Sequence, residues 1–290
     1  MTGTTFDISV LAYDIKRLIE HLMSHEEIGK RIKEEIVYYK QLKDDLQSGD
    51  SSNPGYREAF ALLLEAIITQ SWYYSLKGDE RKNLYNLVHS YGVKGLTRGE
   101  GRKKLLELIN RIGPRRRREI VRKKIIQLLN EMQTMEFHDW VKDLYNKAKK
   151  GKTKILGVKG RDDYLRCVGY WDRVPIDRHE ARFIIRTGIF HACSLSDKGD
   201  PLERDHLQEA VRAFCKKYLN GFKVLGINLG EAPGILDKFI WYYCKEPSKG
   251  EGSNEEGLGI CGKTPKCSEC LLRNTCLFSL TKRGITTKRL

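Results

Sequence analysis

The chain has 290 residues, of which 40% are hydrophobic and 31% are charged, a composition that excludes collagen-like, low-complexity and wholly disordered proteins. Its 53 Lys and Arg outnumber its 38 Asp and Glu, and the formal net charge is +15. This excess favours a polyanionic partner, although a solvated basic surface without a partner has the same charge. No apolar run reaches the ~20 residues of a membrane span, and the N-terminus lacks a secretory layout. We therefore expect a soluble protein of the cytoplasm or nucleoid, with no membrane contact.

Apolar residues recur at helical spacing in several segments, whereas the alternating pattern of a half-buried strand is nearly absent. Residues 60–68 are apolar nearly all round, which predicts a helix buried on every side. The other predicted helical stripes lie at 11–22, 105–112, 121–129 and 181–188. The sequence therefore predicts an all-α fold.

A glutamine and several aromatic residues follow the apolar helix at 60–68, in the order Gln70, Trp72, Tyr73 and Tyr74. Ordinary core and cap residues would give the same pattern. In a protein that extracts a base from duplex DNA, however, a side chain of this size at a helix end suits the filling of the vacated stack. Gln70 is therefore a candidate DNA contact.

Residues 155–168 carry two glycines before a short helical stretch. A hairpin containing Gly157 and Gly160 is predicted to open a helix from Arg161 to Val168. Such a hairpin lays backbone N–H groups and a helix N-terminus against a phosphate, which is a grip on DNA that does not depend on base sequence.

A lysine and an aspartate in the same region are candidates for chemistry. Asp177 stands where the N-cap of the next helix belongs, so capping is its ordinary role. Lys159 taken alone is an exposed surface lysine. Held together in a groove, however, an amine and a carboxylate are the equipment for Schiff-base chemistry on a sugar carbon.

Four of the eight cysteines fall within one short segment, CGKTPKCSECLLRNTC. Four thiolates at this spacing can enclose an iron–sulfur cluster. Structural zinc sites more often use two close C-x2-C pairs, and only one is present, so zinc is the alternative and free cysteines are the third possibility. The four residues are Cys261, Cys267, Cys270 and Cys276.

Together these segments resemble the endonuclease III branch of the helix-hairpin-helix (HhH-GPD) DNA glycosylase superfamily, over about residues 56–280. FALLLEAIITQSW is similar to the family helix whose terminal glutamine enters the DNA stack, and LLELINRIGPRRRREIVRKKIIQLL is similar to the helix pair that precedes the hairpin. KGRDDYLRCVGYWDRVPIDRH is similar to the hairpin's trailing helix and catalytic turn, in a form closest to archaeal 8-oxoguanine glycosylases. The closing CxxC-x5-C is similar to the family's cluster segment.

The resemblance implies two helical domains, 57–168 and 1–56 plus 169–290, which flank a DNA-binding groove. It implies a monomeric base-excision-repair glycosylase with AP lyase activity, acting on double-stranded DNA that contains a damaged base or an abasic site. Lys159 would form the Schiff base and Asp177 would assist it. The implied DNA contacts are Gln70, Gly157, Gly160 and Arg161, and the implied ligands of a [4Fe-4S] cluster are the four cysteines above.

Two departures from the family leave alternatives open. Counting back from Asp177 without gaps puts the family's lysine at Lys159, but the hairpin's first glycine is then missing. A register that pairs Gly157 with Gly160 puts Asp162 at the lysine position, and the enzyme would be a monofunctional glycosylase in which Asp177 activates water. The first cysteine spacing is five residues, where the family usually has six. A non-catalytic protein that binds damaged DNA is the rival outside the enzymes, and an oxidised base is the favoured substrate.

Overall fold

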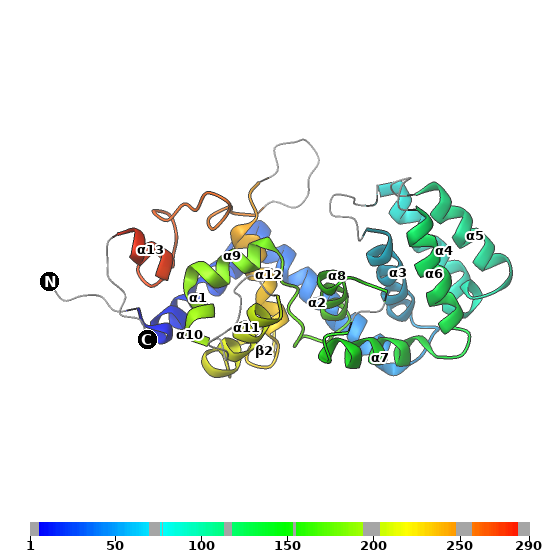
Figure 1. The fold of residues 1–290 in the computed structure, drawn as a ribbon, viewed down its shortest axis with the longest axis horizontal. Helices are drawn as coiled ribbons and strands as arrows, with labels where there is room; N and C mark the ends of the chain where they lie inside the picture. The colour runs from blue at the N-terminus through cyan, green and yellow to red at the C-terminus, as the bar shows by residue number, and fades with distance from the viewer. Residues whose placement is uncertain are drawn as a thin grey trace. The chain divides into compact units, whose positions relative to one another are not determined.

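A computed structural model describes residues 6–69, 76, 78–112, 118–152, 155–193, 204–247 and 257–283. These residues are mostly helical, and the strands among them, β1 (Lys223–Val224) and β2 (Ile227–Asn228), form one two-residue antiparallel ladder. The expectation of a largely helical fold is confirmed (Figure 1). None of the helices in these ranges is both long and apolar enough to cross a membrane.

The chain divides into two compact units, each with its own hydrophobic core. Unit 1 comprises Met1–Val37 and Trp171–Leu290, and unit 2 comprises Tyr38–Tyr170. The division falls inside helix α2 (Glu26–Ser48), so the C-terminal part of that helix belongs to unit 2, whereas the sequence-based domain limits begin at residue 57.

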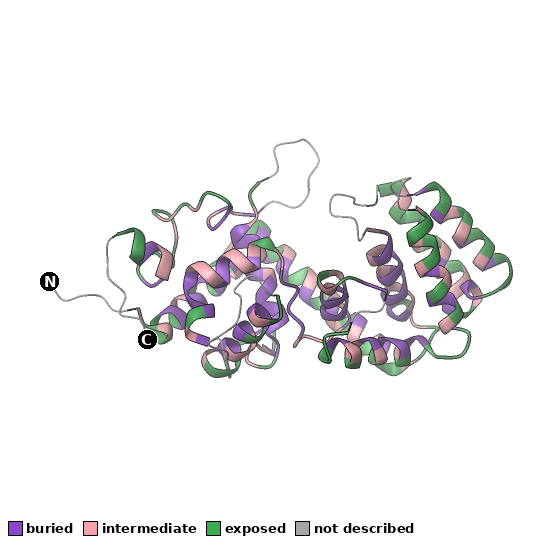
Figure 2. Ribbon diagram, in the orientation of Figure 1, coloured by how far each residue is buried: buried purple, intermediate pink, exposed green. Residues whose placement is uncertain are grey.

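Unit 2 is built around α3, which is the apolar helix expected at residues 60–68. Most of its residues are buried, and Figure 2 shows them in purple along the ribbon. Leu105 and Ile109 of the next predicted stripe are also buried. The helices of this unit after α2 are α3 (Pro54–Thr69), α4 (Gly78–Leu96), α5 (Gly99–Arg111), α6 (Arg118–Glu131), α7 (Phe137–Lys149) and α8 (Val158–Cys167).

Unit 1 packs the first helix of the chain against the elements that follow residue 171. The stripe expected at 11–22 is buried along its whole length, from Leu11 to Leu22, in the core of this unit. Gly188 ends α9 in the left-handed conformation, at φ +92°, and a Cβ there would lie 2.6 Å from the Phe6 ring, so the position requires glycine. The helices are α1 (Ile8–Ser24), α9 (Arg178–Thr187), α10 (Ile189–Cys193), α11 (Arg204–Tyr218), α12 (Pro233–Cys244) and α13 (Leu277–Lys282).

Candidate active site and cysteine segment

Lys159 lies in the first turn of α8 and its side chain is exposed. The helix begins at Val158, and its N-cap is Gly157, which has no side chain to accept from the first N–H groups. The first N–H groups of any helix have no acceptor within it, and the positive end of the helix dipole lies there. The start of α8 therefore presents an amine and backbone donors together, an arrangement that suits a phosphate or an anionic substrate.

The hairpin expected from Gly157 and Gly160 differs in the structure. Gly160 lies inside α8, so the helix starts three residues earlier than the predicted Arg161. Among the residues that the structure describes, a Cβ at Gly157 or at Gly160 would meet nothing within 4 Å. Neither glycine therefore relieves a close contact with this part of the chain.

Arg161 and Asp162 form a buried ion pair behind the first turn of α8. The guanidinium Nε and Nη2 donate to the two carboxylate oxygens of Asp162 at 3.0 and 3.2 Å, and Nη1 donates to the Lys152 carbonyl at 2.9 Å. Both side chains are at most 2% exposed. This placement indicates a structural role for Arg161, which was expected to contact DNA, and it also holds Asp162 away from solvent. Lys159, the lysine of the ungapped register, is exposed, whereas Asp162, the residue of the alternative register, is buried.

Asp177 is the N-cap of α9 and takes part in a reciprocal capping box. Its Oδ1 accepts from the backbone N–H groups of His179 and Glu180 at 2.5 and 3.3 Å, while Glu180 Oε2 accepts from the Asp177 N–H at 3.1 Å. These bonds fix the orientation of the Asp177 carboxyl group. Burial lowers the pKa of His179, against the opposing charge of Asp177. The pattern Asp-x-x-Glu at 177–180 is the signal in the sequence that identifies Glu180 as a partner.

The two candidate catalytic residues belong to different units. Lys159 is part of unit 2 and Asp177 is part of unit 1. Each unit fixes its own residue at the start of a helix, α8 for the amine and α9 for the carboxylate.

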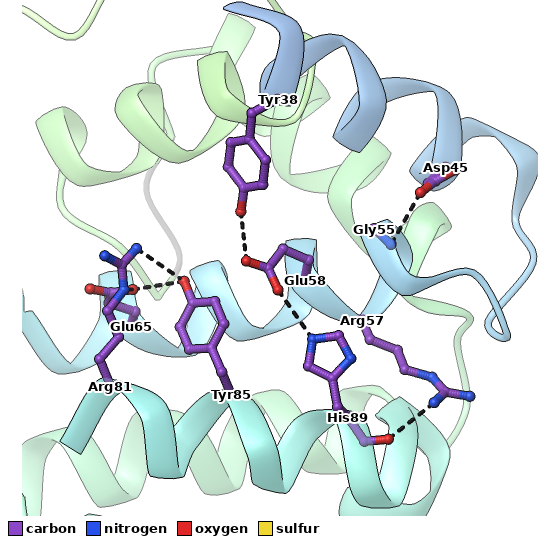
Figure 3. A network of polar contacts seen from close by, with 9 residues as sticks. All are labelled: Tyr38, Asp45, Gly55, Arg57, Glu58, Glu65, Arg81, Tyr85 and His89. Atoms are coloured by element: carbon purple, nitrogen blue, oxygen red, sulfur yellow. Dashed lines mark hydrogen bonds and ion pairs between the residues drawn. The ribbon is translucent and has the colours of Figure 1, made fainter. Parts of the chain in front are cut away.

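Gln70 lies outside the described residues, but the helix that leads to it is firmly held. Glu58 of α3 accepts from the Tyr38 hydroxyl of α2 at 2.8 Å and contacts His89 Nε2 of α4 at 3.1 Å (Figure 3). Burial and the charge of Glu58 raise the pKa of Tyr38, so its hydroxyl stays protonated and donates. A single carboxylate thus joins α3 to the helices on either side.

A second carboxylate on α3 repeats this arrangement two turns later. Glu65 accepts from the Tyr85 hydroxyl at 2.8 Å and pairs with Arg81 Nε at 3.1 Å, both from α4 (Figure 3). Burial and the charge of Glu65 raise the pKa of Tyr85. Because Glu58 and Glu65 lie seven residues apart, they stand on the same face of α3.

The basic stretch at 115–124 falls partly within α6. Arg122 and Lys123 are exposed there, and Lys123 pairs with Glu119 at 2.9 Å. Arg118 donates from Nη2 to the Arg111 carbonyl at 3.1 Å. The remaining arginines of this stretch, at 115–117, lie outside the described residues. Arg122 is thus one exposed cation of α6 that can meet a phosphate.

The cysteine segment, residues 261–276, packs against Arg186 of α9. Arg186 Nη1 donates to the carbonyl oxygens of Cys261 and Gly262 at 3.3 and 2.7 Å and lies 3.7 Å from the Cys261 sulfur. Cys276 Sγ in turn donates to the Arg186 carbonyl at 3.1 Å. A hydrogen bond from Cys244 and the Arg186 guanidinium, against burial, lower the pKa of Cys261 to about 6.

The sulfur atoms of this segment lie in a common electrostatic environment. Tyr243 donates its hydroxyl to Cys270 Sγ at 3.2 Å. Burial raises the pKa of Cys276 to about 11, and the charges of Cys270 and Cys261 act in the same direction. Hydrogen-bond donors commonly surround the sulfur ligands of thiolate clusters, so the donor set fits such a group. Within the described ranges, however, no three His, Cys, Asp or Glu side chains are gathered closely enough to hold a metal ion.

Part of the chain is similar to DNA repair enzymes of Saccharolobus. The 8-oxoguanine DNA glycosylase/AP lyase of Saccharolobus solfataricus is 32% identical over 89 residues, which are 31% of this chain and 37% of that protein. Proteins of the same name from two strains of Saccharolobus islandicus, L.S.2.15 and M.14.25, are 34% identical over 89 residues. The match therefore spans little more than a third of the length of these curated relatives. No family model matches the chain, and no solved structure gives a significant match.

Proposed function

We propose that this chain is a base-excision-repair DNA glycosylase with associated AP lyase activity, and that Lys159 is its nucleophile. The observation that carries the proposal is the exposed amine in the first turn of α8, eighteen residues before Asp177, the N-cap of α9. The similarity of 89 residues to proteins named 8-oxoguanine DNA glycosylase/AP lyase supports the same reaction. We also propose an oxidised base in double-stranded DNA as the substrate.

The proposed reaction uses Lys159 as the nucleophile and gives Asp177 two roles. The damaged nucleotide leaves the stack, at a cost of a few kcal/mol. Asp177 takes a proton from the Lys159 ammonium, and the amine attacks C1′ of the sugar while the base departs with the electrons of the glycosidic bond. The attached nitrogen then gives one proton to O4′ as the C1′–O4′ bond breaks, which opens the sugar ring and leaves a protonated imine between C1′ and Lys159. This imine acidifies the C2′ proton, and loss of that proton expels the 3′ phosphate. Asp177 also stabilises the positive charge that develops on the sugar.

Borohydride trapping on duplex DNA with an 8-oxoguanine or an abasic site tests the nucleophile. The wild-type chain should form a covalent complex, whereas Lys159→Ala should form none. Lys216→Ala, which changes an exposed lysine of α11, serves as the matched control and should trap as wild type does. Base release by Lys159→Ala at the wild-type rate would refute Lys159 and support the monofunctional reading. The absence of both trapping and base release from the wild-type chain, over duplexes with oxidised, alkylated and deaminated bases, would support a non-catalytic DNA-binding protein.

We further propose that Cys261, Cys267, Cys270 and Cys276 hold a [4Fe-4S] cluster, with structural zinc as the alternative. The four thiols in one segment and the donors Arg186 and Tyr243 support a thiolate-bound group. When bound, the group would brace the basic segment around it. Anaerobic purification followed by visible absorption and by iron and zinc analysis distinguishes the two metals. Cys270→Ser should lower the bound iron, and Cys215→Ser, a buried cysteine of α11, should not.

A further inference from the structure

Behind Asp177, α9 carries a second acid that the proposed reaction does not use. Glu180 is 1% exposed, and its Oε2 accepts from the Asp177 N–H at 3.1 Å. Its other oxygen, Oε1, is buried and has no hydrogen-bond partner of good geometry among the described residues. A buried carboxyl oxygen without a partner carries a high free-energy cost.

A third acid faces the same place from α12, which packs against α9. Asp237 is 5% exposed, and its charge is the largest charge effect on Glu180, followed by the interactions of Asp177. Cys244 on α12 is a further titratable group nearby. The charge of Glu180 raises the pKa of its thiol, and the charge of Arg182 on α9 lowers it. Burial first, and then these carboxylates, raise the pKa of Glu180 well above its usual range. Glu180 and Asp237 are both almost fully buried, and a buried carboxyl group that interacts with other carboxylates is held in its neutral form.

We propose that Glu180 is a positioning residue that works as a neutral acid. Its carboxyl group carries one proton on Oε1 and donates it to the neighbouring carboxylate of Asp177 or Asp237, while Oε2 continues to accept from the Asp177 N–H. The effect on rate rests on the proposed function above, but the site of the proton is measurable without it.

This arrangement leaves the negative charge on Asp177. A hydrogen bond donated to a carboxylate favours its ionised form, whereas a second carboxylate at the same distance would favour protonation. An ionised Glu180 would therefore destabilise the ionised form of Asp177, whereas a neutral Glu180 stabilises it. The Glu180 side chain also fixes the orientation of Asp177, because it accepts from the Asp177 N–H in the capping box at the start of α9.

Two substitutions at Glu180 distinguish the loss of its charge from the loss of its hydrogen-bond donor. Glu180→Gln keeps an oxygen for the Asp177 N–H and an N–H donor for the neighbouring carboxylates, and it cannot ionise. We expect its base release and its pH profile to match those of the wild type. Glu180→Leu removes the donor. Its kcat should fall roughly ten- to a hundredfold, the effect of one hydrogen bond to a charged group, with KM for the duplex unchanged and the acidic limb of the profile moved to higher pH. Glu209→Gln, an exposed acid of α11, is the control and should change nothing.

Infrared difference spectroscopy gives a readout that does not depend on activity. At neutral pH the wild-type spectrum minus that of Glu180→Gln should contain the band of a protonated carboxyl group. Asp237→Asn removes one negative neighbour, so the band should titrate away at lower pH in that variant, and this test remains if the leucine variant fails to fold. Absence of the band, or a glutamine variant as impaired as the leucine variant, would overturn the proposal. A band in a protein that releases no base would support the neutral Glu180 and count against the glycosylase instead.

Discussion

The buried pair of Arg161 and Asp162 yields a quantitative prediction for Asp162→Asn. Both side chains are at most 2% exposed, and the two parallel hydrogen bonds at 3.0 and 3.2 Å join them. Removal of one partner from a buried pair costs about 3–5 kcal/mol, because the other charge stays buried without compensation. The asparagine oxygen and the Lys152 carbonyl still accept from the guanidinium. We therefore expect a loss near the lower end, about 3 kcal/mol.

Urea unfolding followed by circular dichroism measures this loss. With a slope of roughly 2–3 kcal/mol per molar urea, the midpoint should fall by about 1 M. The double substitution Arg161→Met with Asp162→Leu should recover most of the stability, because an apolar pair of similar volume replaces a buried ion pair at little cost. A loss below about 1 kcal/mol for Asp162→Asn, the range of exposed pairs, would refute the reasoning.

The same variant tests the register of the proposed catalytic segment. With Lys159 as the nucleophile, Asp162→Asn should release bases at the wild-type rate per folded molecule, since Asp162 acts through stability alone. Loss of base release with unchanged stability would contradict a purely structural role for Asp162.

Three further predictions concern other parts of the chain. Asp177→Asn retains a capping oxygen, so its unfolding free energy should stay within about 0.5 kcal/mol of wild type, while base release falls by at least about a hundredfold; equal loss of both in thermal melts and single-turnover assays would make Asp177 a cap only. Folded Glu180 holds a proton that the unfolded chain releases above its usual pKa near 4.5, so the stability that this proton contributes is lost as pH rises. Relative to Glu180→Gln, the wild-type unfolding free energy should decline by about 1.4 kcal/mol per pH unit in urea titrations above about pH 5, and a flat difference would contradict it. Glu58→Ala leaves the Tyr38 hydroxyl and the His89 ring without their shared acceptor, and should cost about 2 kcal/mol in the same assay; a change below ~0.5 kcal/mol would show that water replaces the carboxylate.

The helices were predictable because burial imposes a helical period on the sequence. Leu11, Ile15, Leu18 and Leu22 recur at that period, and the structure buries all four. The apolar run at 60–68 was likewise identified as a buried helix, and α3 contains it. These features depend on side-chain polarity alone, which the sequence states directly.

The start of α8 and the fate of its charges were not predictable in the same way. Two glycines three residues apart suggest a turn, yet Gly160 adopts helical geometry within α8. The sequence suggests that Arg161 is an exposed cation. Only the tertiary fold brings the Lys152 carbonyl to its guanidinium and buries the ion pair with Asp162. Glu180 has a local signal, the capping box, but its neighbour Asp237 comes from a helix 57 positions further along the chain.

The fastening of α3 has a mechanical consequence for any residue at its C-terminal end. Glu58 ties the helix to α2 and α4, and Glu65 ties the same face to α4 two turns nearer that end. A stacked duplex would push back along the helix axis on a side chain that enters it. That force would have to rotate or shift α3 against contacts at two positions along its length. Movement of the helix along its axis would therefore break at least one of these carboxylate contacts.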